Sequence, residues 1–81
     1  MIKVKFFALL REKLGCDEQL VEFTAGMTLF ELRKHLAAQL SSGNHLLDNK
    51  LLVAVNHELT HENLELKDNS EVAFFPPVTG G

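Results

Sequence analysis

The chain has 81 residues, which is enough for one small domain with one modest hydrophobic core and leaves no room for a separate cofactor-binding domain. Hydrophobic residues make up 46% of it and charged residues 23%, a globular balance that argues against a disordered tail or a fibrous repeat. The net charge of -3 gives no electrostatic reason to expect a nucleic-acid partner, because nucleic acids bind to basic surfaces.

The amino-terminal segment contains an apolar run, but this run is too short for a secretion signal. Its apolar run, residues 6–10, is five residues long, and no stretch approaches the roughly 18 apolar residues of a membrane-spanning helix. The single cysteine, Cys16, cannot form an internal disulfide, as is typical of a reducing compartment. We therefore expect a cytoplasmic protein without a membrane partner.

The first predicted element is a strand over residues 2–9, because its side chains alternate between two faces. Residues 10–15 then favour a helical turn that Gly15 closes, and residues 18–23 favour a second strand, antiparallel to the first. In the first strand one face carries Ile2, Val4 and Phe6, and the other carries Lys3, Lys5 and Phe7.

A helix is predicted to begin at Thr28. Thr28 and Glu31 have the spacing of a capping box, in which each side chain accepts a hydrogen bond from the backbone of the other residue. Gly43 stands where a carboxyl-terminal cap is expected. Leucines recur on one face of this amphipathic helix, and two neighbours widen the stripe: Leu29, Leu32, Leu36 and Leu40, with Phe30 and Ala37.

Three further strands are predicted in the second half of the chain. They cover residues 51–56, a short edge segment around Leu59, and residues 71–75, where the prolines that follow end the strand. Residues 41–50 are expected to be the loosest part. This order predicts an α+β fold of the ubiquitin-like β-grasp kind, a mixed sheet with one main amphipathic helix on one face. Residues 1–75 would form the domain and residues 76–81 an extended tail, with the first and last strands adjacent in the middle of the sheet.

The strand alternation also predicts an exposed apolar surface. If Phe6 and Phe74 point toward the helix, Phe7 and Phe75 point away from it and stand close together, with Leu59 near them. Aromatic side chains are enriched in protein interfaces, so this surface favours a protein partner. The alternative is that strand twist or a bulge turns one ring inward.

The tail is predicted to act as a slender arm. Pro76 and Pro77 hold the chain extended, and the six residues 76–81 span about 20 Å when fully stretched. Gly80 has no side chain to obstruct passage through a narrow channel, which leaves the carboxylate of Gly81 as the functional group. The alternative is a terminus that is simply frayed. If the arm enters a partner, its contacts come from Pro76, Pro77, Val78 and Thr79.

Four segments together resemble the small, sulfur-carrying subunits of molybdopterin synthase. They are "IKVKFFALLREKLG", "TLFELRKHLAAQL", "LLVAVN" and, most specifically, "EVAFFPPVTGG". The resemblance covers nearly the whole chain, is weakest over residues 41–50, and shows no departure at the carboxyl end.

The resemblance implies a function without catalysis by this chain itself. A separate ubiquitin-activating-like adenylyltransferase would use ATP to adenylate Gly81, and sulfur would then replace AMP to give a thiocarboxylate. The tail would enter the large subunit of molybdopterin synthase, which carries the catalytic residues, and donate sulfur to a pterin precursor to build the dithiolene. The family assembles as a 2:2 heterotetramer. No cofactor or metal would be bound by this chain.

Other readings of the sequence stay open. One is a ubiquitin-like modifier or a sulfur carrier for thiamin or tRNA thiolation, and another is an interaction domain whose tail carries no chemistry. Cys16 lacks a defined histidine partner and is interpreted as an incidental thiol. His57 and His61 have a spacing that gathers metal ligands on a helix, but they lie in a predicted strand and turn, so zinc is not expected.

Overall fold

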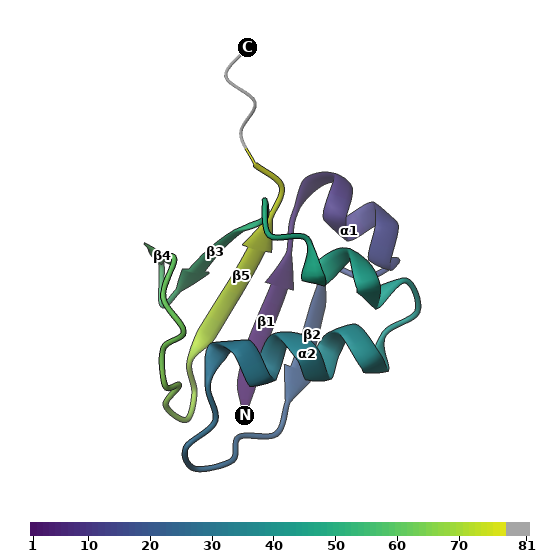
Figure 1. The fold of residues 1–81 in the computed structure, drawn as a ribbon. Coiled ribbons are helices and arrows are strands. Elements are labelled where there is room, and N and C mark those ends of the chain that lie inside the picture. Colours follow the sequence, from purple (N-terminus) through teal and green to yellow (C-terminus); the bar gives the residue numbers. More distant parts are fainter. Residues whose placement is uncertain (78–81) are drawn as a thin grey trace.

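A computed structural model describes residues 1–77 and shows a five-stranded mixed sheet with helices packed on one face (Figure 1). The strands lie in the order β2-β1-β5-β3-β4. This arrangement confirms the predicted α+β roll. The elements are β1 (Ile2–Phe6), α1 (Ala8–Leu14), β2 (Glu18–Val21), α2 (Leu29–Gln39), the 3-10 helix η1 (Gly43–Leu47), β3 (Leu52–Val55), β4 (Glu58–Thr60) and β5 (Glu71–Phe75).

The first and last strands are neighbours in the middle of the sheet, as the sequence predicts, and the structure shows that they run parallel. Val4 lies opposite Val72 and Phe6 opposite Phe74, and all four side chains are buried. The remaining strand pairs are antiparallel. Because both central strands send alternate side chains toward α2, the core forms between the sheet and that helix.

The turn predicted after β1 is a complete short helix, α1. Gly15 ends it in the left-handed conformation, with a φ of 74°, and its N–H donates to the carbonyl of Arg11 at 3.0 Å. Leu10 and Leu14 are buried and anchor α1 against the core. The helix thus connects β1 to β2 and occupies the end of the sheet at which β5 finishes (Figure 1).

The capping box at the start of α2 is present. Thr28 Oγ1 accepts from the N–H of Glu31 at 3.2 Å, and Glu31 Oε1 accepts from the N–H of Thr28 at 3.1 Å. The predicted apolar stripe is correct for Leu29, Leu32 and Leu36, which are buried.

The prediction that Phe30 widens this stripe is wrong, because 53% of its surface is exposed. A residue one position after Leu29 is rotated by about 100° around the helix, which carries its side chain away from the sheet. The ring instead lies beneath the ammonium group of Lys34, with 5.2 Å between Nζ and the ring centroid.

Residues 41–50 are not the loose segment that the sequence predicts. Leu46 of η1 is fully buried, and the guanidinium of Arg33 donates to the carbonyls of Leu46 and Asp48. Burial lowers the pKa of Arg33, while the nearby Asp48 carboxylate opposes that shift. The buried side chain of Leu46 and the guanidinium of Arg33 therefore hold this segment against α2.

Gly43 has a different role from the predicted helix cap. The cap of α2 is Leu40, and Gly43 begins η1 instead. A Cβ atom built on Gly43 would lie 2.5 Å from the carbonyl oxygen of Ala37. Glycine is required here because η1 crosses directly against the backbone of α2.

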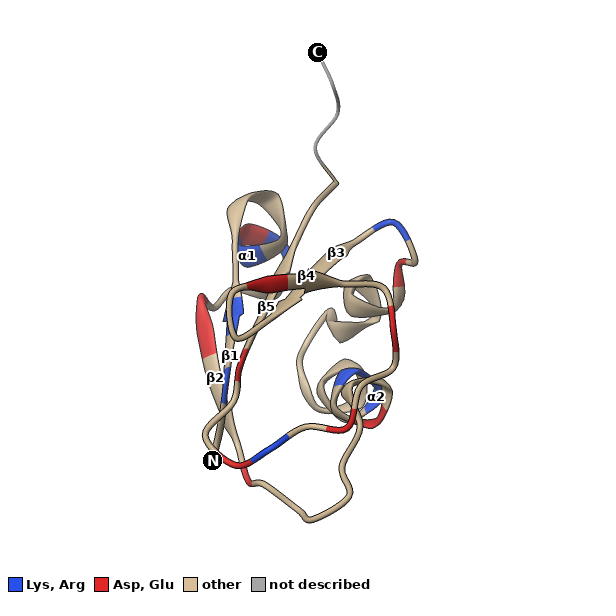
Figure 2. Cartoon of the chain, turned by 90° about the vertical axis from the view of Figure 1, so that its left-hand side faces the viewer, with Lys and Arg blue, Asp and Glu red and all other residues tan. Residues whose placement is uncertain are grey.

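The two faces of the sheet differ in what covers them. Figure 2 shows α2 on one side of the sheet only. We call the side without α2 the outer face. Its side chains are the alternate residues of each strand that point away from the core.

Candidate functional site

The predicted aromatic pair forms on the outer face. The rings of Phe7 and Phe75 meet edge to face, with 6.5 Å between their centroids. The N–H of Phe7 donates to the carbonyl of Phe74 at 3.2 Å, which continues the pairing of β1 with β5 by one residue. Phe7 is 45% exposed and Phe75 is half-buried. The pair is consequently both fixed by the backbone and open to a partner.

Strand pairing places further apolar side chains beside this pair. Leu52 of β3 lies opposite Phe75, Ala54 lies opposite Ala73, and Leu59 of β4 lies opposite Ala54. Leu59 is 63% exposed. These side chains share one face of the sheet. We call the set the outer patch: Phe7, Leu52, Ala54, Leu59, Ala73 and Phe75.

The sequence predicts three of these six residues and misses Leu52, Ala54 and Ala73. The position of these three residues beside one another depends on the register of β3 against β5, and the sequence pattern of a single strand does not reveal that register. The alternating valines that flank Ala54, Val53 and Val55, are a signal that could have indicated its orientation.

A tight turn holds β4 in place on this face. Asn56 and His57 have φ values of 50° and 72°, the left-handed pair that a two-residue type I′ hairpin requires. The turn is fastened to β5, since Asn56 donates its N–H to the carbonyl of Glu71 at 2.8 Å and accepts from the N–H of Glu71 at 2.9 Å. These contacts fix the position of Leu59 relative to β5.

Charged groups border the outer patch on the side away from the tail. The carboxylate of Glu71 lies 4.0 Å from the ammonium of Lys5 and 3.5 Å from Nε2 of His57. Such exposed pairs contribute little to stability. They give the apolar surface a polar rim, which is the usual composition of a protein interface.

The tail begins directly at the outer patch. Pro76, half-buried, and Pro77, exposed, follow Phe75 without an intervening residue. The predicted contact residues Val78 and Thr79, the slender Gly80 and the reactive Gly81 lie outside the described residues. Their assigned roles, and the division of the chain at residue 75, stay predictions.

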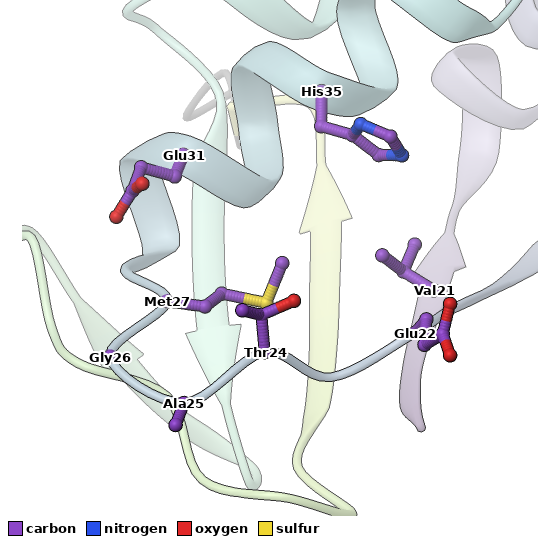
Figure 3. Close-up of a pocket in the computed structure, with 8 residues that line it drawn as sticks. All are labelled: Val21, Glu22, Thr24, Ala25, Gly26, Met27, Glu31 and His35. Carbon is purple, nitrogen blue, oxygen red and sulfur yellow. The ribbon is translucent and has the colours of Figure 1, made fainter.

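A hollow lies where the chain passes from β2 to α2. Its volume is about 500 Å³, and Figure 3 shows the eight residues that line it. Its ionisable side chains, Glu22, Glu31 and His35, are all exposed. The connection from β2 to α2 lies at the opposite end of the molecule from the start of the tail (Figure 1), and we assign the hollow no role.

Neither a metal-binding cluster nor a membrane-spanning helix is found within residues 1–77. No group of three or more His, Cys, Asp or Glu side chains in this part is arranged to hold a metal ion. None of the helices in the same part is long and apolar enough to cross a membrane. Cys16 is half-buried, and its Sγ lies 3.7 Å from the side-chain nitrogen of Gln19.

Comparison with known proteins gives matches over the full chain. The ThiS family matches residues 4–81. The molybdopterin synthase sulfur carrier subunit of Escherichia coli (strain K12) is 51% identical over 83 residues, and the alignment covers 100% of both chains.

Two solved structures share the fold. One is the small archaeal modifier protein 1 of Methanosarcina acetivorans, with a TM-score of 0.78 and 27% identity over 99% of this chain and 95% of that chain. The other is the complex of subunits 1 and 2 of molybdopterin-converting factor from Helicobacter pylori 26695, in which the matching chain has a TM-score of 0.70 and 26% identity, with 99% and 97% covered. The chain therefore belongs to the ThiS family, and the resemblance to the sulfur-carrying subunits of molybdopterin synthase is confirmed.

Proposed function

We propose that this chain is the sulfur carrier of a molybdopterin synthase and that the sulfur is held as a thiocarboxylate on Gly81. The observation that carries the proposal is the position of the aromatic pair, since Phe75 belongs to the outer patch and is also the last residue before the tail. A partner bound to the patch would hold the root of the tail and thereby direct its end. The 51% identity to a sulfur carrier subunit supports the chemical assignment.

The chemistry requires help from a second protein. A carboxylate is a poor acyl donor until its oxygen is converted to a good leaving group, which adenylation with ATP achieves, and sulfur then displaces AMP at the same carbon. The 81-residue sequence contains no G-x-x-x-x-G-K-[ST] loop. We therefore assign the ATP-dependent step to a ubiquitin-activating-like adenylyltransferase, for which this chain is the substrate.

Donation of the sulfur is assigned to a complex with the large subunit, in a 2:2 assembly. The tail would deliver the thiocarboxylate to a pterin precursor, and the catalytic residues would belong to the large subunit. Transfer removes sulfur from Gly81, so water must supply the oxygen that restores the carboxylate. The related chain in a complex of subunits 1 and 2 of molybdopterin-converting factor supports a partner of this kind.

Deletion of Gly81 tests the proposal. The intact chain, purified from sulfur-replete cells, should show by mass spectrometry a fraction heavier by one sulfur-for-oxygen exchange. The chain without Gly81 should show none of this fraction and should form no dithiolene with the large subunit, although its unfolding temperature is unchanged. Addition of one residue after Gly81 should have the same effect, because the reacting group moves by about 3.5 Å. Dithiolene formation by either variant at the wild-type rate would refute the assignment of Gly81.

A modifier function is the second candidate, because a small archaeal modifier protein shares 27% identity and the fold. A modifier would join its terminal carboxyl group to lysine side chains of other proteins. Cells that express a tagged chain should then contain a ladder of isopeptide-linked products. A sulfur-bearing fraction without such a ladder favours the carrier.

A further inference from the structure

A second, smaller hollow lies at the root of the tail, on the side that faces α1 and η1. Its volume is about 120 Å³. For comparison, a protein cavity of about 150 Å³ accepts one benzene molecule. Small-molecule sites usually measure at least about 300 Å³, so the hollow suits one apolar side chain better than a nucleotide or a pterin. Its apolar lining consists of Leu9, Leu10, Leu51, Pro76 and Pro77.

One side of this hollow is an exposed leucine on α1. Leu10 is buried in the core and only 3% exposed, whereas Leu9 beside it is 61% exposed. Adjacent residues on a helix point about 100° apart, so the burial of Leu10 leaves Leu9 directed away from the core. Leu9 adds an exposed apolar group two residues after Phe7 of the outer patch. Apolar side chains therefore lie near the root of the tail both in the outer patch and on α1.

The rim of the hollow carries a cation that forms no ion pair with a described residue. Lys13 lines the hollow and forms no ion pair within residues 1–77. Asp48 also lines it, but its Oδ1 accepts from the N–H of Lys50 at 2.9 Å, and its charge acts on the guanidinium of Arg33. His45, the remaining polar residue of the lining, adds no negative charge. The rim is thus suited to a carboxylate beside the apolar group.

We propose that this hollow receives one apolar side chain of the large subunit and that a neighbouring carboxylate of that subunit pairs with Lys13. The inference rests on the proposed function. A protein that encloses the tail from Pro76 onward must contact both sides of its root, and two lining residues are close in the chain to the outer patch, since Pro76 directly follows Phe75 and Leu9 comes two residues after Phe7. The large subunit would thus contact the root of the tail at two apolar surfaces, the outer patch and the hollow.

Two substitutions and two matched controls test this contact. In the full chain, Leu9→Ser and Lys13→Glu alter the hollow, while Leu47→Ser and Lys34→Glu make the same changes at exposed positions of η1 and α2. Leu47 is 56% exposed, close to the value for Leu9. Affinity for the purified large subunit is measured by calorimetry for each, and the unfolding temperature confirms that each variant folds.

The two hollow variants should each bind the large subunit about 5- to 50-fold more weakly, while the controls stay within about 2-fold of wild type. The loss from Lys13→Glu should shrink as salt is raised from 0.05 to about 0.5 M, since salt screens charge pairs, whereas the loss from Leu9→Ser should persist. Wild-type affinity in both hollow variants would overturn the inference. Equal losses of affinity in all four variants, the two controls included, would overturn the inference as well.

The test of this contact can fail independently of the test of the proposed function. If Phe75→Ala weakens binding and deletion of Gly81 stops sulfur transfer while the hollow variants behave as wild type, the proposed function stands and the hollow is not part of the interface. If the hollow variants lose affinity only for the adenylyltransferase, the assignment to the large subunit is overturned. Sulfur transfer without Gly81 would instead refute the proposed function.

Discussion

At the scale of single residues, Phe75 connects the two parts of the candidate site. Its ring packs against Phe7 in the outer patch, and its carbonyl group leads into Pro76. The side chain is half-buried before any partner is bound, so the chain itself fixes its position. A preorganised aromatic group of this kind is typical of an interface hot spot, because little side-chain entropy remains to be lost on binding.

Replacement of Phe75 by alanine should weaken binding to the large subunit by roughly 1 to 4 kcal/mol. The same change at Phe30, which is exposed on α2, is the matched control and should leave binding unchanged. Titration calorimetry with folded, purified variants measures both. An affinity for Phe75→Ala equal to that of wild type would show that the outer patch is not the docking surface.

At the scale of elements, the close contact of η1 with α2 shapes the side of the molecule next to the tail. Leu46 anchors η1 in the core, and Arg33 donates to the carbonyl groups of Leu46 and Asp48. This packing places His45 and Asp48 at the rim of the small hollow. The conformation of residues 41–50 therefore bears on the root of the tail, although this segment has the weakest family resemblance.

Substitution of Gly43 by alanine should destabilise the fold by about 1 to 3 kcal/mol, because the new Cβ would overlap the backbone of Ala37 and force η1 away from α2. Urea unfolding measures the change. Gly26→Ala is a useful comparison, since Gly26 has a φ of 85° but no atom within 4 Å of the added Cβ. Amide exchange should become faster in η1 for Gly43→Ala alone, and equal exchange in the two variants would contradict the close-packing explanation.

At the scale of the whole molecule, a solvent-exposed charge pair joins the two central strands at their amino ends, and we expect it to contribute a small, pH-dependent part of the stability. The amino group of Met1 lies 2.6 Å from Oδ1 of Asp68, and the N–H of Asn69 donates to the carbonyl of Met1 at 3.2 Å. The hydrogen bond from the terminal amino group lowers the pKa of Asp68 below its ordinary value of 3.8.

This pKa shift predicts a specific response to acid. Because the folded state holds the proton of Asp68 more weakly than the unfolded state, the pair stabilises the fold at pH values above 3.8, and its contribution is lost as the pH falls through the folded-state pKa. Asp68→Asn should therefore unfold at slightly lower urea than wild type at pH 6, and the two midpoints should converge as the pH falls well below 3.8. A constant difference across that range would contradict the electrostatic origin.

The sequence predicts the sheet and the aromatic pair because these depend on local alternation. Ile2, Val4 and Phe6 are buried and alternate with the less buried Lys3 and Lys5, so the direction of the Phe7 side chain follows from its place after the strand. Residues 41–50 are a different case, since five residues of 3-10 helix are too few to show a period, and the burial of Leu46 depends on α2. The exposure of Phe30 and the hollow beside Leu9 likewise depend on how separate elements pack together.

The parallel pairing of β1 with β5 has a consequence for biosynthesis. The strand made last is the one that occupies the middle of the sheet, so a nascent chain that stops before Glu71 lacks the strand that joins β2-β1 to β3-β4. Such a fragment also lacks Phe75. The outer patch and the start of the tail can therefore form only after residues 71–77 have been made.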